Sequence, residues 1–311
     1  MARVWVTGLA GFTGPYLRDA LAAAGHDVTG PPQSAQFDLL VPSTLTAALT
    51  VAQPDYVIHL AAVSFVQHDD MAQIYAVNAI GSENLLQAIA TAAPNVRKIV
   101  LASSANVYGN GTAELLDETV MPAPVNHYAC SKLAMEHLAR TWFDRLPIVI
   151  TRPFNYTGPG QSEMFLVPKL VAHFAGRQAA ISLGNLDVER DFSDVRMLAD
   201  VYTRLLAAPL AHQVVNVCSG VTRSLRSLLA TLESVCGYAP QVRLAPDLVR
   251  RAEIHRLAGS NRKLRDALGA LRYTDFDATL AWMADSYRQG RGHVPDGAPP
   301  AVEPAAGPEA A

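Results

Sequence analysis

Tyr128, Lys132 and Ser104 are the residues whose types and spacing best suit proton transfer. Tyr128 and Lys132 stand four residues apart in TyrAlaCysSerLys and would share one face of a helix. A lysine ammonium about 4 Å from a phenol favours the phenolate by roughly 4 kcal/mol, which lowers the phenol pKa by up to about three units. We predict that Tyr128 exchanges a proton with a carbonyl oxygen, while the Ser104 hydroxyl positions that oxygen. The alternative is an ordinary exposed helix pair near a serine that caps a strand end.

A glycine-rich turn precedes these residues in the chain. Gly8, Gly11 and Gly14 form a GxxGxxG pattern directly after the first predicted strand and at the start of the first predicted helix. Such glycines permit a tight turn and let a pyrophosphate approach backbone N–H groups at a helix N-terminus. We therefore predict a dinucleotide-binding turn that includes Phe12 and Thr13.

The end of the second strand does not distinguish NAD(H) from NADP(H). An acid at this place commonly binds the ribose 2′-hydroxyl, whereas an arginine accommodates a 2′-phosphate. Here Gly30 occupies the position, within HisAspValThrGlyProProGln. Asp38, followed by Leu39, is a candidate contact for the adenine end of the cofactor, although a role as a turn acid or helix N-cap fits equally well.

Short β-branched segments alternate with longer helical patterns through the first half of the chain. This alternation is typical of a doubly wound parallel sheet of the Rossmann type, which binds ligands at the carboxyl edge of its strands. Helices cover both faces of such a sheet, so its strands are expected to be continuously apolar. The predicted strands are 3–7, 56–61, 98–103 and 148–152, and the predicted helices are 15–24, 69–92 and 126–146.

The pattern changes after Thr151 to longer loops rich in Pro, Gly and Asn, followed by shorter helices and strands. We predict an α/β fold in which residues 1–150 form mainly the dinucleotide-binding domain. Residues 151–289 would form mainly a smaller α/β lobe that binds the substrate. Residues 290–311 are rich in Pro, Ala and Gly without periodicity, and are expected to be a disordered tail.

The composition excludes several classes of protein. The chain has 311 residues, 50% of them hydrophobic and 17% charged, which is enough for a folded core. Its apolar segments fall short of the roughly 20 residues that cross a bilayer, and we expect no secretory leader. A net charge of −3 provides no basic surface for nucleic acid. Cys130, Cys218 and Cys236 are widely spaced and indicate neither disulfides nor a metal site, so we expect a cytoplasmic protein.

The predicted helix 69–92 is apolar on more than one side. Ile74, Val77 and Leu85, among others, would point in different directions around it. Such a helix needs burial against the sheet on one side and against another surface on the other. We expect a homodimer built on this helix and on the helix that contains Tyr128.

Four motifs in this order resemble the extended short-chain dehydrogenase/reductase family, which acts on nucleotide-sugars. They are GxxGxxG, HisLeuAlaAla from His59, SerSerxxValTyrGly from Ser103 and YxxxK from Tyr128. The resemblance covers nearly the whole chain. Within it, ArgProPheAsnTyrThrGlyProGlyGln from Arg152 and LeuGlyAsnLeuAspValGluArgAspPhe from Leu183 are similar to the family's GDP-mannose branch.

The resemblance implies an NAD(P)H-dependent reduction of the 4-keto group of GDP-4-keto-6-deoxy-D-mannose, which gives GDP-D-rhamnose or its talo epimer. It implies a catalytic triad of Ser104, Tyr128 and Lys132, with Lys132 also holding the nicotinamide ribose of NADP(H) or NAD(H). The implied cofactor contacts are the turn residues together with Asp38, Leu39, Leu60, Ala61 and Ala62.

The resemblance also implies a set of contacts to the GDP-sugar. A diphosphate needs charge-assisted donors, which Arg190 and Arg250 would supply, although a surface ion pair is the ordinary alternative for each arginine. The implied contacts are Ser64, Ser104, Asn106, Asn155, Lys169, Asn185, Arg190, Arg250 and Glu253.

Asn106 departs from the family's dehydratases. These carry a glutamate two residues after the triad serine or threonine, and its carboxyl moves a proton while water is eliminated. An amide cannot do this near neutral pH, so the sequence favours a reductase over a GDP-mannose 4,6-dehydratase. Related reductases often carry an acid here, so Asn106 departs from them as well. A nucleotide-sugar 4-epimerase and a non-catalytic NAD(P)-binding protein are the remaining alternatives.

Overall fold

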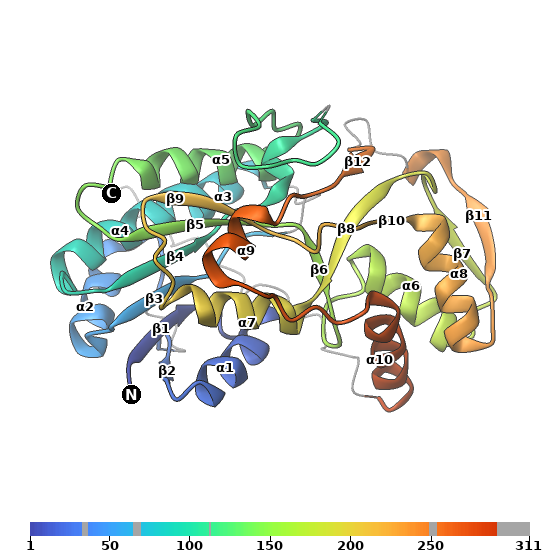
Figure 1. Ribbon diagram of the computed structural model, residues 1–311, viewed down its shortest axis with the longest axis horizontal. Helices are drawn as coiled ribbons and strands as arrows, with labels where there is room; N and C mark the ends of the chain where they lie inside the picture. Colours follow the sequence, from blue (N-terminus) through green and yellow to red (C-terminus); the bar gives the residue numbers. More distant parts are fainter. Residues whose placement is uncertain (33–36, 65–69, 112, 249–253, 291–311) are drawn as a thin grey trace, which may run out of the picture.

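Six strands of the described residues pair in parallel as the central sheet, in the order β2-β1-β3-β4-β5-β9 (Figure 1). The inner strands are apolar and buried, as predicted for strands covered on both faces. The computed structural model describes residues 1–32, 37–64, 70–111, 113–248 and 254–290. The strands are β1 (Arg3–Thr7), β2 (Asp27–Thr29), β3 (Tyr56–His59), β4 (Lys98–Ala102), β5 (Ile148–Pro153) and β9 (Gln213–Val217).

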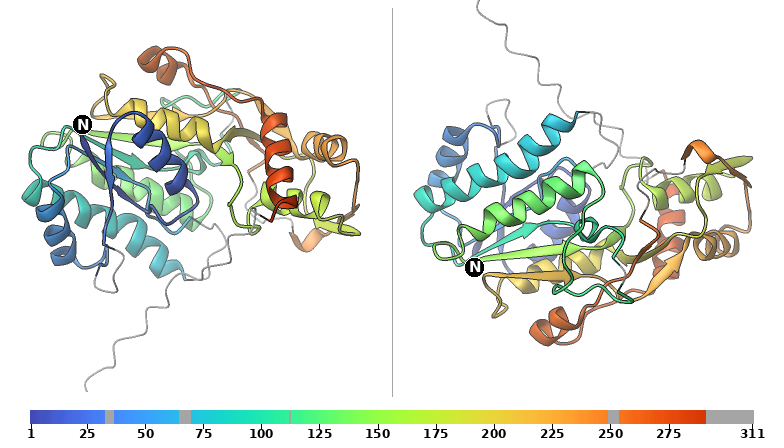
Figure 2. Two further views of the ribbon diagram at one scale, coloured as in Figure 1. Left: turned by 90° about the horizontal axis from the view of Figure 1, so that it is seen from below. Right: turned by 90° about the horizontal axis from the view of Figure 1, so that it is seen from above.

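Helices enclose this sheet on both faces, so the predicted doubly wound α/β fold is confirmed (Figure 2). Alternate residues of β1 point to opposite faces: Val4 and Val6 join the core under α1 and α7, and Trp5 joins the core under α2, α4 and α5. The bounds of these helices are α1 (Thr13–Ala23), α2 (Pro42–Ala52), α4 (Gly81–Ala92), α5 (His127–Arg140) and α7 (Val195–Leu205).

The predicted helix 69–92 is interrupted in the structure. Residue 69 lies outside the described residues, and α3 (Met71–Tyr75) leads into a π-helical turn (Ala76–Ile80) before α4 begins. A π turn accommodates one inserted residue and rotates the side chains that follow it. Because apolar residues lie on several sides of this segment, hydrophobic periodicity could not reveal that shift.

The predicted helix 126–146 also differs from the structure, because α5 ends at Arg140. Beyond it, the Thr141 and Trp142 N–H groups donate to carbonyl oxygens three residues back, which tightens the chain into turns.

A smaller α/β lobe lies at the end of the molecule opposite α2 (Figure 1). Its strands form a small sheet and a parallel pair, and its helices pack around a core that includes Phe174, Phe192 and Leu228. The sheet contains β6 (Asn155–Thr157), β8 (Glu189–Asp194), β10 (Thr222–Ser224) and β12 (Arg256–Leu257), and the pair is β7 (Ala180–Leu183) with β11 (Gln241–Leu244). The helices are α6 (Leu166–Ala175), α8 (Leu225–Cys236) and α10 (Phe276–Arg288).

The chain passes between the two lobes more than once. After β8, α7 returns to pack on α1, and β9 pairs with β5 in the central sheet. Next, α9 (Arg262–Leu268) packs beside β9, whereas α10 joins the smaller lobe. The division at residue 150 stays a prediction of where each role mainly lies, and the predicted tail 290–311 falls almost entirely outside the described residues. In the described part of the chain, no helix is long and apolar enough to span a membrane.

Candidate active site

The structure brings Ser104, Tyr128 and Lys132 together at the carboxyl edge of the central sheet. Ser104 follows β4 and caps a short 3₁₀ helix (Ala105–Tyr108), while Tyr128 and Lys132 lie in the first two turns of α5. The three residues are 6%, 8% and 3% exposed, and a hydrogen bond joins the Tyr128 and Ser104 side chains. A buried phenol, hydroxyl and ammonium at this edge are suited to move a proton to or from a bound carbonyl group.

The start of α5 is fixed by side chains of two elements. Asn126 caps the helix by accepting a 2.8 Å hydrogen bond from the Ala129 N–H. Asn78, fully buried in the π turn, donates to Ser131 Oγ at 3.0 Å and to the Val63 carbonyl oxygen at 3.0 Å. Through Asn78, these bonds connect Ser131, which lies between Tyr128 and Lys132 on α5, to the segment that follows β3. Sequence reasoning missed Asn78, because it is one of four amide side chains in the predicted helix 69–92 and no local pattern distinguishes it from the others.

The pKa of Tyr128 differs from the sequence prediction. Burial raises it to about 12, and the hydrogen bond with Ser104 only partly opposes this rise. Lys132 does not reverse this rise, and its Nζ donates instead to the Ala102 carbonyl oxygen at 2.8 Å. The predicted lowering by Lys132 is therefore wrong for this structure, and Tyr128 is a neutral phenol near pH 7.

Lys132 is itself strongly affected by burial, which lowers its pKa to about 8. The nearby carboxylate of Glu136 opposes this effect by attracting the charged ammonium. His59, under the same edge, has its pKa lowered to about 3 by burial and by Lys132, so it is neutral and hydrogen-bonded to Thr7 and Ser82.

The glycine turn has the shape needed to receive a pyrophosphate. Gly8 has φ of +79°, and a Cβ on Gly14 would lie 2.0 Å from the Leu9 carbonyl oxygen, so both positions require glycine. A Cβ on Gly11 would meet only the Gly8 carbonyl oxygen, at 3.3 Å, and Gly11 is exposed. A side chain at Gly11 therefore requires only a small shift of the turn, and glycine at this place leaves room for a ligand at the start of α1. These residues fit a dinucleotide cofactor.

Most other predicted cofactor residues line the same edge. Asp38 is exposed and accepts a 2.8 Å hydrogen bond from the Leu40 N–H, as a turn acid does. Leu39 packs toward α4. The chain 60–62 follows β3, where the Ala61 N–H donates to Thr7 Oγ1. At the end of β2, a Cβ on Gly30 would lie 2.8 Å from the Val6 carbonyl oxygen, so an acid or arginine does not fit there.

Among the predicted substrate residues, Asn106 is in direct contact with the triad. Its backbone N–H and its Nδ2 each donate to Ser104 Oγ at 3.2 Å. Ser64 and Asn155 are exposed, on the segments that follow β3 and β5.

Three further predicted substrate residues, Lys169, Asn185 and Arg190, belong to the smaller lobe. Lys169 Nζ donates to the Ser182 carbonyl oxygen at 3.3 Å, and Asn185 accepts from the Asp187 N–H at 2.9 Å. Arg190 donates to the backbone carbonyl oxygens of 254 and 255. Arg250 and Glu253 lie outside the described residues.

Tyr156 was not predicted and also reaches this edge. Its hydroxyl shares a 3.0 Å hydrogen bond with Thr13 Oγ1, and its ring stacks on Phe12 in the glycine turn. Tyr156 also interacts electrostatically with Tyr128 and contributes to the rise of the Tyr128 pKa. A tyrosine inside a loop-like segment gave no signal of this position in the sequence.

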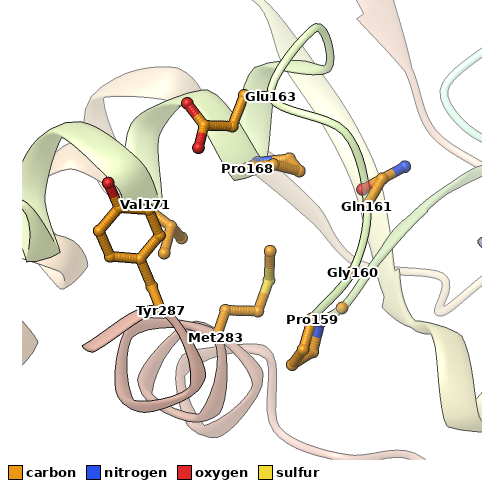
Figure 3. A pocket seen from close by; sticks show the side chains of 9 residues that line it. Pro159, Gly160, Gln161, Glu163, Pro168, Val171, Met283 and Tyr287 are labelled. Atoms are coloured by element: carbon orange, nitrogen blue, oxygen red, sulfur yellow. The ribbon is translucent and has the colours of Figure 1, made fainter. Parts of the chain in front are cut away.

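A small pocket between α6, α10 and the loop after β6 is a separate feature (Figure 3). Val171, Met283 and Tyr287 face one another across it, with Pro159 and Gln161 on the loop side. Its volume of about 20 Å³ suits about one water molecule, so it is not a site for a nucleotide-sugar.

Comparisons with known proteins agree with this geometry. A family model described as "NAD dependent epimerase/dehydratase family" matches residues 4–218. The GDP-6-deoxy-D-talose 4-dehydrogenase of Aggregatibacter actinomycetemcomitans is 35% identical over 90% of this chain and 96% of its own length. The GDP-6-deoxy-D-mannose reductase of Pseudomonas aeruginosa is 37% identical over 86% of this chain and 91% of its own length. The structure of RMD from Pseudomonas aeruginosa complexed with NADPH superposes with a TM-score of 0.85 at 32% identity, and covers 93% of this chain and 100% of that one.

Proposed function

The chain belongs to the NAD dependent epimerase/dehydratase family, and we propose that it reduces the 4-keto group of GDP-4-keto-6-deoxy-D-mannose with NADPH or NADH. The observation that carries this proposal is the assembled set of Ser104, Tyr128 and Lys132 with an amide, Asn106, bonded to Ser104. A dehydratase would need a carboxyl group in place of that amide.

The residues of the triad have separable tasks. When bound, the reduced nicotinamide supplies a hydride to the carbonyl carbon. Tyr128 donates its phenolic proton to the carbonyl oxygen, and it is in the neutral form because burial raises its pKa. Lys132 would hold the ribose hydroxyls of the cofactor with its ammonium group, which donates to the Ala102 carbonyl oxygen in this structure.

Asn106 fixes the orientation of the Ser104 hydroxyl group. Two N–H groups of Asn106 occupy the lone pairs of Ser104 Oγ, so the serine hydroxyl is left to act as a donor. It can then donate to the substrate oxygen or to the Tyr128 phenol. Both interactions stabilise negative charge as it develops on oxygen.

The smaller lobe supplies the donors for the GDP group in this proposal. Arg190 and Lys169 donate to backbone carbonyl oxygens of the lobe, and a diphosphate would replace those neutral acceptors with charged ones. Arg250 and Glu253 are proposed contacts from the adjoining segment. The two relatives, whose names specify a GDP-6-deoxy-D-mannose and a GDP-6-deoxy-D-talose, support a GDP-sugar with either configuration at C4.

The test is a coupled assay. A separate dehydratase generates GDP-4-keto-6-deoxy-mannose from GDP-mannose, and the oxidation of NADPH and NADH by this protein is followed in parallel. Consumption of either supports the reductase and gives the cofactor preference, and NMR of the product at C4 identifies the rhamno or talo epimer. Absence of consumption contradicts the proposal, and GDP-mannose itself then tests dehydratase or epimerase activity.

We also propose that the protein is a cytoplasmic homodimer. The helical face that includes the π turn exposes Ile80 by 53%, and α5 packs beside it. All three cysteines are free thiols, as expected in a reducing compartment. Light scattering tests the assembly, and a monomeric mass would exclude the dimer.

A further inference from the structure

A buried ion pair lies behind the catalytic helix. Glu136 on α5 and Arg152 on β5 have side chains that are 0% and 2% exposed. Arg152 Nε and Nη2 donate to the two carboxylate oxygens of Glu136 at 2.8 Å and 2.7 Å. Burying two charges costs about as much as their attraction returns, so such a pair is weak evidence for a purely stabilising role. Its location suggests another role.

Glu136 connects the elements that carry the triad. Ser103 Oγ donates to Glu136 Oε1 at 2.7 Å, and Ser103 directly precedes Ser104. On α5, Glu136 stands four residues after Lys132 and therefore on the same helix face. The carboxylate thus joins the end of β4 to the face of α5 that presents Tyr128 and Lys132.

Arg152, the partner of Glu136, connects this group of contacts to the short 3₁₀ helix after Ser104. The Arg152 guanidinium carbon lies 4.7 Å from the centre of the Tyr108 ring, and Tyr108 ends that turn. The Tyr108 hydroxyl in turn donates to Asn216 Oδ1 on β9 at 2.8 Å. Both sides of Ser104 are therefore anchored, by Ser103 to Glu136 and by Tyr108 to Arg152.

We propose that Glu136 is a positioning residue for the reaction, whose carboxylate holds Ser103, and with it Ser104, against α5 and presents a negative charge to Lys132 one helical turn away. This inference rests on the proposed reductase function. It assigns no contact between Glu136 and the substrate or cofactor.

The charges around Lys132 agree with this assignment. Burial lowers the Lys132 pKa to about 8, and the Glu136 carboxylate is the charge that opposes this fall. Tyr128 on the same helix and His59 on β3 are neutral at pH 7. Arg152 on β5 and Arg140 on α5 both pair with Glu136, and each would repel the Lys132 ammonium without that carboxylate. Loss of the Glu136 carboxylate therefore removes its attraction for the Lys132 ammonium. It also leaves the arginine charges uncompensated, and both effects lower the Lys132 pKa.

The decisive variant is Glu136→Gln, which keeps the volume and removes the charge. NADPH fluorescence gives the dissociation constant between pH 6 and 10, independently of turnover. We expect wild-type affinity to weaken as pH rises through about 8, when Lys132 loses its proton. In Glu136→Gln this midpoint moves down by about one pH unit, and kcat above pH 8 falls about tenfold.

Three further variants separate charge from packing. Glu136→Gln/Arg152→Met also removes one of the two cations that pair with Glu136 and leaves Arg140, so its midpoint lies between those of wild type and Glu136→Gln. Ser103→Ala deletes only one hydrogen bond, so it lowers kcat severalfold and leaves the midpoint unchanged. Lys98→Met is the matched control: Lys98 is a buried lysine at the opposite end of β4 that donates to the Ala208 carbonyl oxygen, and it should leave both properties unchanged.

A folded Glu136→Gln with the wild-type midpoint and kcat overturns the proposal, as does an equal shift in Lys98→Met. If Glu136→Gln does not fold, the double variant decides, and a wild-type midpoint in it overturns the proposal. If the wild-type protein binds NADPH with this pH dependence but does not reduce the 4-keto sugar, the proposed function fails while the positioning of Lys132 stands.

Discussion

The carboxyl edge of the central sheet, here called the catalytic edge, and the smaller lobe hold their polar groups in different ways. At the edge, Ser104, Tyr128 and Lys132 are almost fully buried, and each has a hydrogen bond to a neighbouring side chain or strand end. In the smaller lobe, Lys169 and Arg190 are only partly buried and donate to backbone carbonyl oxygens. The first set is already arranged for chemistry, and the second makes bonds that a stronger acceptor can displace.

This difference predicts different kinetic consequences. Groups fixed before the substrate arrives contribute mainly to the transition state, and their loss lowers kcat. Groups that exchange a backbone oxygen for a phosphate oxygen contribute to ground-state binding, and their loss raises KM. Substitutions in the two regions can therefore break or sharpen the comparison.

The largest effect is expected from Tyr128→Phe. The ring keeps its packing while the proton donor is lost, so kcat falls by about a thousandfold or more with little change in NADPH affinity. Steady-state kinetics and NADPH fluorescence on one preparation measure both. Retained turnover would contradict the mechanism, and a loss confined to KM would place Tyr128 with the recognition groups instead.

Gly14→Ala and Gly11→Ala form a matched pair in the cofactor turn. The new methyl group at Gly14 would collide with the Leu9 carbonyl oxygen at 2.0 Å, so we expect loss of the turn, a lower Tm and NADPH binding weakened by about a hundredfold or more. At Gly11 the nearest atom is 3.3 Å away and only a small shift of the turn is needed, so Tm falls much less than in Gly14→Ala and NADPH binding weakens by roughly tenfold. Equal Tm values for the two variants would show that Gly14 is not required by the fold.

The same contrast explains what the sequence could reveal. The glycine turn, the Tyr128–Lys132 spacing and the strand before Ser104 are local patterns, and a parallel sheet brings their ends to one edge. Asn78, Tyr156 and the Glu136–Arg152 pair depend on contacts between distant segments, which no local pattern encodes. The π turn and the pKa of Tyr128 also escaped prediction, because both depend on burial that only the packed structure fixes.

Asn106→Asp tests how the edge is arranged. A carboxylate would accept a hydrogen from Ser104 Oγ, whereas the Asn106 amide donates to it, so the serine hydroxyl would turn away from Tyr128 and the substrate oxygen. We expect kcat to fall by about ten- to a hundredfold with nearly unchanged KM. Asn106→Ser, which retains a donor, is the control and should lose less. An unchanged kcat in Asn106→Asp would contradict the orienting role of the amide.

Arg190→Gln tests the smaller lobe. The amide can still bond to the carbonyl oxygens near residue 254 but has no charge for a diphosphate, so KM for the GDP-sugar should rise about tenfold at nearly constant kcat and NADPH affinity. Arg226→Gln is a suitable control, because Arg226 forms an exposed ion pair with Asp187 in the same lobe. A fall in kcat alone would mean that Arg190 stabilises the transition state. The division into catalytic groups at the sheet edge and binding groups in the smaller lobe would then be wrong.

The smallest effect concerns the pH dependence of stability, which has opposite signs for one buried group in each of the two regions. Burial lowers the pKa of His59 under the catalytic edge to about 3, so its contribution to stability is present above about pH 6.5 and is lost as pH falls toward 3. Burial raises the pKa of Asp191 in β8 to about 6, so its contribution is present below about pH 4 and is lost as pH rises to 6.

In wild type these two changes in stability partly cancel between pH 7 and pH 5. His59→Gln removes only the first, so the free energy of unfolding of the variant should gain about 2 kcal/mol relative to wild type over that interval. Urea unfolding at both pH values measures this, and parallel changes in the two proteins would show that His59 is not held neutral by burial.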